Sequence, residues 1–282
     1  MQIEVIIEKK SHKLDAEEGK TILETLQEHG IHVLTAPCGG RGRCGKCTVE
    51  VEHMGEVLAC MTKVTDGMRI TIPKVQLRAQ KSKIAENGTV THYPADDGEG
   101  LDAACDIGTT TVVCHLIDGK TGEKLATVSE PSAQRSFGAE VLSRIQAAEA
   151  GKLEILKEQI IFQIAQMLRT LQKKTGRGEQ IQRLAVVGNT VMCHLFAGIS
   201  PVSIGVTPFM PQEFFGKEYT GEQLGLTDCR SVYIAPAVAG FVGGDITSDL
   251  LAVMQKNPKE KVLLLDIGTN GEMAVGNEDQ IY

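Results

Sequence analysis

The sequence predicts a mixed α/β protein built from two domains and a linker. A chain of 282 residues is long enough for two ordinary domains, each with its own core. The first part alternates short strand patterns with one helix around a loop rich in cysteine and glycine. In the second part an apolar strand is followed by Asp-Ile-Gly-Thr, and this combination occurs twice, at residues 106–109 and 266–269.

Composition and charge exclude several classes of function. Hydrophobic residues make up 42% of the chain, and no stretch approaches the ~20 consecutive apolar residues of a membrane span. The net charge of −7, few aromatic residues and the absence of tryptophan argue against a nucleic-acid-binding protein. The first residues have no signal-peptide pattern, and eight cysteines without export indicate a reducing compartment. We therefore predict a cytoplasmic protein that binds neither nucleic acid nor a membrane.

Residues 1–75 follow the element order of a β-grasp domain. Alternating apolar and polar residues predict strands at 2–8 and 12–15, and Thr21 is expected to cap a helix that ends near Gly30. Three more strands are expected at residues 48–52, 57–60 and 68–72. Two strands, a helix and further strands around a ligand loop are the order found in ferredoxins.

Four cysteines in this domain have a spacing typical of metal ligands. They are Cys38, Cys44, Cys47 and Cys60. The spacing differs from the plant-type [2Fe–2S] ferredoxin pattern by one loop residue and a shorter last gap. The glycines of the loop permit positive φ angles and backbone N–H groups that point at sulfur. These glycines are Gly39, Gly40, Gly42 and Gly45. Because only one short C-x2-C pair is present, a [2Fe–2S] cluster is favoured over the alternatives, a structural zinc site or free thiols.

Two further features of the N-terminal part have two interpretations each. Arg41, Arg43 and Lys46 crowd the cysteine loop, where they could dock an acidic partner or form a solvated basic rim. Residues 76–100 have little apolar periodicity and are predicted to be a linker. A tethered cluster carrier could visit more than one partner, and an inert spacer is the alternative.

Residues 101–258 follow the element order of one ribonuclease-H-like lobe. The expected elements are strands at 101–107, 112–117 and 124–128, helices at 137–150 and 152–174, a strand at 183–187, a short helix to 197, a strand at 232–235 and a helix from 243 to about 255. Residues 202–225 are expected to be irregular. Residues 259–282 are expected to begin a second lobe, with a strand at 261–265 and a return strand near 273–275.

The two Asp-Ile-Gly-Thr copies predict a phosphate site. Each places a carboxylate at a strand end, before a turn whose N–H and hydroxyl groups can cradle phosphate, and the carboxylate can hold Mg²⁺ directly or through water. A single copy would equally suit a hairpin turn, so the repetition carries the inference. The candidate residues are Asp106, Gly108, Thr109 and Thr110 in the first copy, and Asp266, Gly268, Thr269, Asn270 and Gly271 in the second.

The remaining cysteines and histidines do not suggest a further site. Cys105, Cys114, Cys193 and Cys229 lack ligand-like spacing and are expected to be buried core thiols. His194, on a short predicted helix, is expected to be structural. No residue has the pattern of a catalytic nucleophile.

The paired turns, with residues 187–190 between them, resemble the acetate kinase, sugar kinase, Hsp70 and actin superfamily. In that superfamily the two turns face each other across a nucleotide cleft, so the resemblance implies ATP and Mg²⁺ as ligands. It adds Gly188, Asn189 and Asp245 to the candidate site. Together with an N-terminal ferredoxin domain, the chain resembles the ATP-dependent reductive activators of corrinoid proteins. Residues 136–140 and 240–245 take part in this resemblance.

This resemblance implies that single electrons pass from the cluster to the Co(II) of a corrinoid protein, giving Co(I), with help from ATP hydrolysis. An upstream electron donor is then also required. One alternative is a plain [2Fe–2S] electron-carrier module without nucleotide coupling, although a carrier needs no nucleotide cleft. Another is a kinase-like enzyme acting on a small metabolite, although phosphoryl transfer needs no one-electron centre.

The chain stops at Tyr282, two strands into the expected second lobe. We therefore expect a fragment or one half of a split protein. Such a chain would not turn over ATP by itself, and a homodimer or a complementing C-terminal half would complete the cleft.

Overall fold

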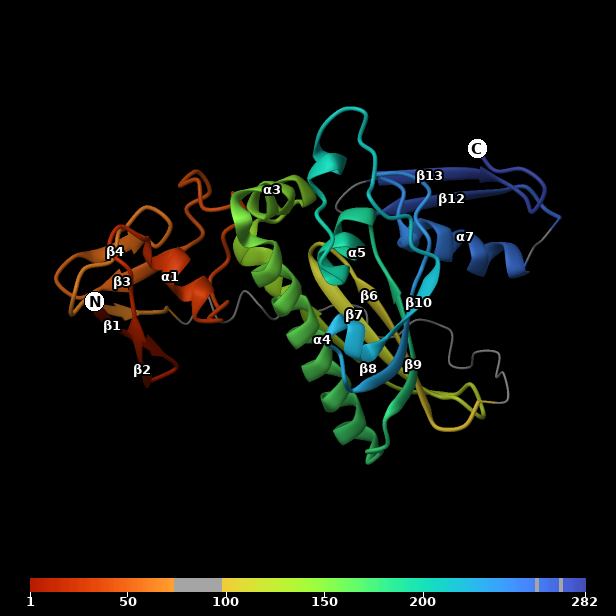
Figure 1. Ribbon diagram of the computed structural model, residues 1–282, viewed down its shortest axis with the longest axis horizontal. Helices are drawn as coiled ribbons and strands as arrows, with labels where there is room; N and C mark the ends of the chain where they lie inside the picture. Colours follow the sequence, from red (N-terminus) through yellow and green to blue (C-terminus); the bar gives the residue numbers. More distant parts are fainter. Residues whose placement is uncertain (74–97, 257–258, 269–270) are drawn as a thin grey trace. The chain divides into compact units, whose positions relative to one another are not determined.

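The computed structural model describes residues 1–73, 98–256, 259–268 and 271–282, and the chain divides into two units (Figure 1). One unit holds residues 1–73 together with residues 133–147. The other unit holds the remaining described residues. The expected linker at 76–100 lies almost wholly outside the described residues, so it stays a prediction.

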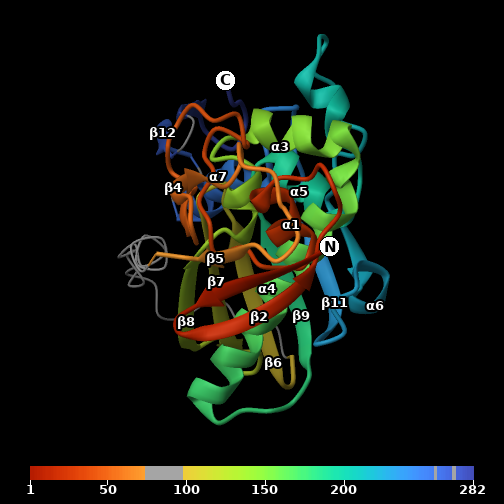
Figure 2. The same cartoon turned by 90° about the vertical axis from the view of Figure 1, so that its left-hand side faces the viewer.

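The first unit is a β-grasp fold, as the element order predicts. Its sheet has five strands in the order β2-β1-β5-β3-β4. The strands are β1 (Gln2–Ile7), β2 (Lys10–Asp15), β3 (Thr48–Val51), β4 (Gly55–Leu58) and β5 (Arg69–Thr71). β1 pairs antiparallel with β2 and parallel with β5, and the hairpin of β1 and β2 is the red pair of strands in Figure 2.

Helix α1 (Ile22–Glu28) completes the core of this unit. The Thr21 hydroxyl accepts a hydrogen bond from the Glu24 N–H, and the Glu24 carboxylate accepts one from the Thr21 N–H. This reciprocal cap satisfies two of the donors that a helix start leaves open. Leu23 and Leu26 are buried in the core with the sheet, because residues three apart lie on one face of a helix.

The second unit has the sheet of a ribonuclease-H-like lobe, which confirms the predicted fold class. Six strands lie in the order β10-β11-β9-β6-β7-β8. They are β6 (Leu101–Ile107), β7 (Thr111–Asp118), β8 (Lys124–Pro131), β9 (Ile181–Val187), β10 (Lys217–Thr220) and β11 (Cys229–Ile234). β6, β7 and β8 form an antiparallel meander, whereas β9 lies parallel to both β6 and β11. The C-terminal ends of three strands therefore meet at one edge of the sheet.

Helix α4 (Leu153–Thr175) lies along this sheet beside β7 and β8 and packs on α5 (Thr190–Ala197) (Figure 1). Its buried apolar residues recur every three or four positions, as predicted. They include Leu156, Ile160, Ile164, Leu168 and Leu171. The helix ends at Gly176, whose φ of 68° is left-handed and whose N–H donates to the Gln172 carbonyl.

A hairpin and a helix complete the described part of the second unit. Helix α7 (Gly244–Lys256) follows the turn after β11. Strands β12 (Val262–Ile267) and β13 (Gly271–Gly276) pair antiparallel, with Leu265 opposite Met273. They correspond to the two strands expected at 261–265 and near 273–275, and their assignment to a second lobe stays a prediction.

Two sequence expectations are wrong. The stretch 202–225 is not wholly irregular, because it contains the 3₁₀ turn η3 (Val202–Gly205), the edge strand β10 and the one-turn helix α6 (Gly221–Leu224). β10 was missed because its four residues are polar or aromatic and lack an alternating apolar pattern. The helix expected at 137–150 is broken.

The break in that helix has a local cause. The segment forms the 3₁₀ helix η1 (Ala133–Phe137), then α3 (Val141–Ala147), then a π-helical turn η2 (Ala148–Lys152). Gly138 has a φ of 143°, and a Cβ there would lie 2.1 Å from the Ser143 Cβ, so only glycine fits between η1 and α3. η1 and α3 pack with the first unit, although the sequence places them within the lobe 101–258.

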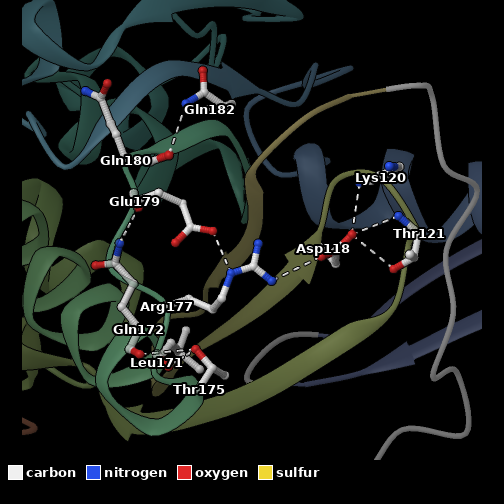
Figure 3. A network of polar contacts seen from close by, with 10 residues as sticks. All are labelled: Asp118, Lys120, Thr121, Leu171, Gln172, Thr175, Arg177, Glu179, Gln180 and Gln182. Carbon is white, nitrogen blue, oxygen red and sulfur yellow. Dashed lines mark hydrogen bonds and ion pairs between the residues drawn. The ribbon is translucent and has the colours of Figure 1, made fainter.

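The turn between β7 and β8 is closed by a polar network (Figure 3). The Asp118 carboxylate accepts hydrogen bonds from the backbone N–H groups of Lys120 and Thr121, as expected for an Asx-type turn. Arg177, just beyond α4, pairs with both Asp118 and Glu179. The network therefore fastens the end of α4 to the β7–β8 turn.

None of the described helices combines the length and the apolar character needed to cross a membrane.

We expect Ile164→Ala to lower the free energy of unfolding of the second unit by about 2–5 kcal/mol, because it leaves a cavity between α4 and the sheet. On the same helix, Phe162 is 66% exposed. Phe162→Ala should change the free energy of unfolding by less than about 0.5 kcal/mol. Urea unfolding followed by circular dichroism measures both values, and equal effects would contradict the packing described for α4.

Candidate functional site

The four candidate cysteines lie at one end of the first unit, in two neighbouring segments. Cys38 and Cys44 lie in the loop after α1, while Cys47 precedes β3 and Cys60 follows β4. The Cys47 carbonyl accepts a hydrogen bond from the Ala59 N–H at 2.9 Å, which brings the second pair together. The sulfurs of Cys38 and Cys44 are 3.3 Å apart. Cys47 and Cys60 are buried, and Cys38 and Cys44 are half-buried.

The loop stabilises negative charge on the Cys38 sulfur. Burial by itself would raise the pKa of the Cys38 thiol, but hydrogen bonds outweigh it and lower the pKa to about 6. The donors are the backbone N–H and the thiol of Cys44 and the backbone N–H groups of Arg43 and Arg41. Several N–H groups aimed at one sulfur favour the thiolate, which is the form that binds metal.

Cys60 lies in a less polar environment. Burial and the neighbouring Cys47 thiol raise the pKa of Cys60 to about 11, although the backbone N–H of Gly42 donates to it. A metal ion bound here would stabilise the thiolate of Cys60 through its own positive charge. The Cys47–Cys60 pair therefore also has the donor chemistry of a metal site.

The loop conformation depends on its glycines, as the sequence predicts. Gly39, Gly40, Gly42 and Gly45 all have φ between 64° and 81°. At Gly42 a Cβ would also lie 2.8 Å from the Met61 sulfur. This backbone lets consecutive N–H groups turn toward the cysteines.

Sulfur ligands with N–H donors fit a [2Fe–2S] cluster. In the described part of the chain no three Cys, His, Asp or Glu side chains already adopt a metal-ligand geometry. The fit therefore rests on the identity and chemistry of the donors. The assignment of the four cysteines as ligands stays a prediction.

The second candidate site forms where three turns of the second unit meet. The Asn189 side chain donates to the Thr109 hydroxyl at 2.9 Å, and its oxygen caps α5 by accepting from the Met192 N–H at 3.0 Å. The Asp245 N–H donates to the Gly188 carbonyl at 3.3 Å. The structure thus brings together the first Asp-Ile-Gly-Thr turn, the turn at 188–189 and the start of α7.

Glycine is required where these backbones approach each other. A Cβ at Gly108 would lie 2.5 Å from the Thr111 carbonyl oxygen, and one at Gly188 would lie 2.7 Å from the Ile107 side chain. At Gly243 a Cβ would lie 2.6 Å from the backbone of Asn189. Because glycine has no side chain, the turns can approach each other and a ligand could still contact their backbone N–H groups.

Several carboxylates repel one another at this edge. Desolvation, followed by repulsion from Asp245, Asp249 and Asp266, raises the pKa of Asp106 to about 7, although its side chain keeps contact with solvent. The pKa values of Asp245 and Asp249 are raised by desolvation and by neighbouring carboxylates. Glu272 is affected in the same way, through desolvation and then Asp266 and Asp245. A divalent cation would relieve this repulsion.

Most of this site was predicted, and two residues were missed. Asp249 follows Asp245 by four positions, so both lie on one face of α7, and this spacing could have identified it. Glu272 comes directly after the second Asp-Ile-Gly-Thr turn, on β13. Gly268 and Gly271 flank that turn, and Thr269 and Asn270 lie outside the described residues.

The remaining cysteines and His194 have structural roles, as predicted. Cys105, Cys114, Cys193 and Cys229 are buried in the second unit. His194 is fully buried, and its Nδ1 lies 2.7 Å from the Thr190 carbonyl oxygen.

A β-grasp unit with a loop of four cysteines and a ribonuclease-H-like lobe with a carboxylate-lined edge together define the class of protein. The family model "RACo middle region" matches residues 101–257, more than half of the chain. The chain belongs to this family. Residues 4–74 match the model of the 2Fe-2S iron-sulfur cluster binding domain.

Relatives of known name support the same grouping. The corrinoid activation enzyme RamQ of Eubacterium limosum is 28% identical over 328 residues, covering 88% of this chain and 55% of that protein. The [Co(II) methylated amine-specific corrinoid protein] reductase of Methanosarcina barkeri is 28% identical over 196 residues, covering 63% and 34%. A solved structure of a reductive activator for corrinoid, iron-sulfur protein aligns with a TM-score of 0.61 and 26% identity, covering 99% of this chain and 62% of that one. The chain thus spans about half of the length of the first of these curated relatives and about a third of the length of the second.

If the four cysteines hold a cluster, Cys38→Ala should remove most of the bound iron and sulfide, because the sulfur with the most N–H donors is lost. Anaerobically reconstituted wild-type protein should contain about two iron and two sulfide per chain. Cys229→Ala, at a buried thiol of β11, serves as the control and should retain the cluster. Zinc without sulfide in the wild type would contradict the assignment.

The raised pKa of Asp106 predicts a pH dependence of stability. This carboxyl holds its proton more tightly in the folded than in the unfolded state, so stability falls as pH rises from about 4 to about 7. Asp106→Asn should therefore raise the melting temperature at pH 8 and leave it unchanged at pH 4.

Asp118→Asn is a control of opposite sign. Hydrogen bonds, the Thr121 N–H first, lower the pKa of Asp118, so this substitution should destabilise the protein at pH 8 and not below the native pKa. Thermal unfolding between pH 4 and 8 measures Asp106→Asn, and for Asp118→Asn the range is extended to about pH 2, since its native pKa lies below the usual value for aspartate. If Asp106→Asn were destabilising by the same amount at every pH, the repulsion at this edge would be disproved.

Proposed function

We propose that this protein acts in the ATP-dependent reductive activation of a corrinoid protein, passing single electrons to Co(II) to give Co(I). The observation that carries the proposal is the presence, in one chain of this family, of a thiolate-stabilising cysteine loop and a carboxylate-lined turn edge. The names of the relatives support a corrinoid protein as the target.

Cys38, Cys44, Cys47 and Cys60 would hold the [2Fe–2S] cluster. When bound, the cluster supplies a centre that takes up and gives up one electron at a time. The backbone N–H groups of Arg41, Gly42 and Arg43 donate to its sulfur ligands and stabilise added negative charge. An upstream electron donor completes the electron path.

Nucleotide would bind at the edge formed by residues 106–110, 188–189 and the start of α7. The repulsion among Asp106, Asp245 and Asp266 makes this edge hostile to a bare triphosphate. These carboxylates would hold Mg²⁺, which prefers oxygen ligands and whose positive charge would relieve the repulsion. We therefore propose that ATP binds as its magnesium complex, with Thr109, Thr110 and the second turn (residues 268–271) contacting phosphate.

Arg41, Arg43 and Lys46 are exposed beside the cysteine loop. An acidic face of the corrinoid protein could approach them, which would favour docking near the cluster and fast, salt-dependent association. A second copy of this chain or another chain that packs on the carboxylate-lined edge is part of the proposal.

The test combines the cluster-loaded protein, a Co(II) corrinoid protein, a reductant and Mg·ATP, and follows the loss of the Co(II) absorbance. ATP should accelerate the reduction. Asp106→Asn, which removes one cation ligand, should abolish most of the ATP effect and leave the slower ATP-independent rate unchanged. Cys38→Ala should abolish both.

A plain electron carrier is the alternative. Equal rates with and without ATP in the wild type would establish that alternative and end the activator proposal. A rate that is lost completely in Asp106→Asn would contradict the role assigned to this carboxylate, because it should act only through the nucleotide.

A further inference from the structure

Residues 133–147 connect two parts of the fold in an unusual way, and we call them the strap. They consist of η1, the turn at residues 138–140 and α3. In sequence they follow β8 of the second unit directly, and in space they pack with the first unit. A β-grasp sheet with its own helix does not require a segment from so far downstream.

The strap is hydrogen-bonded to the helix and loop that carry the cysteines. The Gln27 side chain, on α1, donates to the Ser136 carbonyl at 2.9 Å, and both residues are buried. The Ala139 N–H donates to the Pro37 carbonyl at 3.2 Å, and Pro37 directly precedes Cys38. The first of these bonds is buried and therefore costly to leave unmade, so it fixes the position of the strap, while the second joins half-buried residues.

The strap and the cysteine loop also approach each other through their backbones. A Cβ at Gly39 would lie 3.4 Å from the Phe137 carbonyl oxygen and 3.5 Å from the Ser143 Cβ. The Phe137 ring is buried, and its centre lies 6.4 Å from that of His32. The loop between Pro37 and Gly39 therefore has little space to move without moving the strap.

The residue before the strap is tied to the candidate nucleotide turn. The Ser132 N–H donates to the Thr110 carbonyl at 2.9 Å. The Gln163 side chain, on α4, donates to the Pro131 carbonyl at 2.8 Å. The end of β8 is thus fixed to the lobe, and the next residues are fixed to the cysteine loop.

We propose that the strap is a positioning element that couples nucleotide binding at Asp106–Thr110 to the conformation of the cysteine loop. The inference rests on the proposed function, because it takes both ligands from there. Only three residues lie between Ser132 and Ser136, and all three belong to η1, so the connection is short and has little slack. We therefore expect a displacement of the Thr110 turn to move the start of the strap, since so few residues leave little chain to absorb it.

The consequence is a change in the electron affinity of the cluster. The N–H groups of residues 41–44 that donate to Cys38 and Cys60 belong to the loop that the strap holds. Changing the length or angle of such bonds changes how strongly one added electron is stabilised. By linkage, nucleotide must then bind the oxidised and the reduced protein with different affinities, and the ratio of the two dissociation constants is the coupling factor.

The experiment measures this ratio on the full chain loaded with its cluster under anaerobic conditions. The probe is a non-hydrolysable ATP analogue with Mg²⁺, titrated by calorimetry against oxidised and dithionite-reduced protein. In Gln27→Met the donor to Ser136 is lost while the size of the side chain is kept. We expect the coupling factor to fall about twofold or more toward unity, with little change in iron content.

Gln172→Met is the matched control. The Gln172 amide, in the last turn of α4, donates to the Glu179 carbonyl at 2.8 Å, and neither residue belongs to the strap (Figure 3). Its coupling factor should equal that of the wild type. Phe137→Leu is a second strap variant for the case in which Gln27→Met does not fold, and it should also lower the factor.

The outcomes separate the two proposals. A wild-type factor of one, with measurable nucleotide binding, overturns the coupling and leaves the nucleotide site intact. A factor that is unchanged in Gln27→Met or Phe137→Leu overturns the role of the strap. Absence of binding in both redox states overturns the nucleotide part of the proposed function and the coupling with it.

Discussion

Sulfur anions that are partly removed from water need hydrogen-bond donors, and the organisation of the first unit follows from this requirement. The Cys38 sulfur receives the N–H groups of Cys44, Arg43 and Arg41, which a right-handed backbone could not all aim at one point. Glycines with positive φ solve this geometric problem. A loop of this kind has little internal secondary structure, so its shape depends on what surrounds it: α1, the β3–β4 hairpin and the strap.

In the second unit the electrostatic problem is the mutual repulsion of carboxylates, which a cation would relieve. Three strand ends meet at one edge because β6, β9 and β11 run parallel, and each is followed by a turn with exposed backbone donors. The same edge concentrates carboxylates whose mutual repulsion raises the pKa of Asp106 to about 7. An edge that offers N–H groups to phosphate and carboxylates to a cation suits the magnesium complex of a nucleotide better than either component alone.

In our proposal the strap is the segment through which nucleotide binding at residues 106–110 affects the cysteine loop. A tethered carrier, as the linker at 76–100 suggests, would have a cluster loop indifferent to the state of the lobe. The bonds from Gln27 to Ser136 and from Ser132 to Thr110 instead leave few free residues between the two sets of contacts. Under the proposed function, this arrangement lets nucleotide binding influence the electron-transfer step without covalent chemistry.

The sequence by itself determined what depends on local pattern and residue chemistry. Alternation and helical spacing predicted nearly all strands and helices, including α4, because burial of one face imposes a period on the sequence. The cysteine spacing and the repeated Asp-Ile-Gly-Thr turns predicted which residues take part in the candidate sites. The edge strand β10 was missed because a polar four-residue strand at a sheet edge carries no such period.

Only the tertiary structure decided which distant residues act together. Asp249 and Glu272 belong to the carboxylate edge because the fold brings α7 and β13 there, and no local pattern near Asp106 contains that information. The break in the helix expected at 137–150 is local by contrast, because it follows from the close approach of Gly138 to Ser143, a few residues further along the chain. Residues 133–147 pack against the cysteine loop through hydrogen bonds to Gln27 and Pro37, which join positions about a hundred residues apart. Such pairings are made only when the backbone has folded, and they leave no period in the sequence.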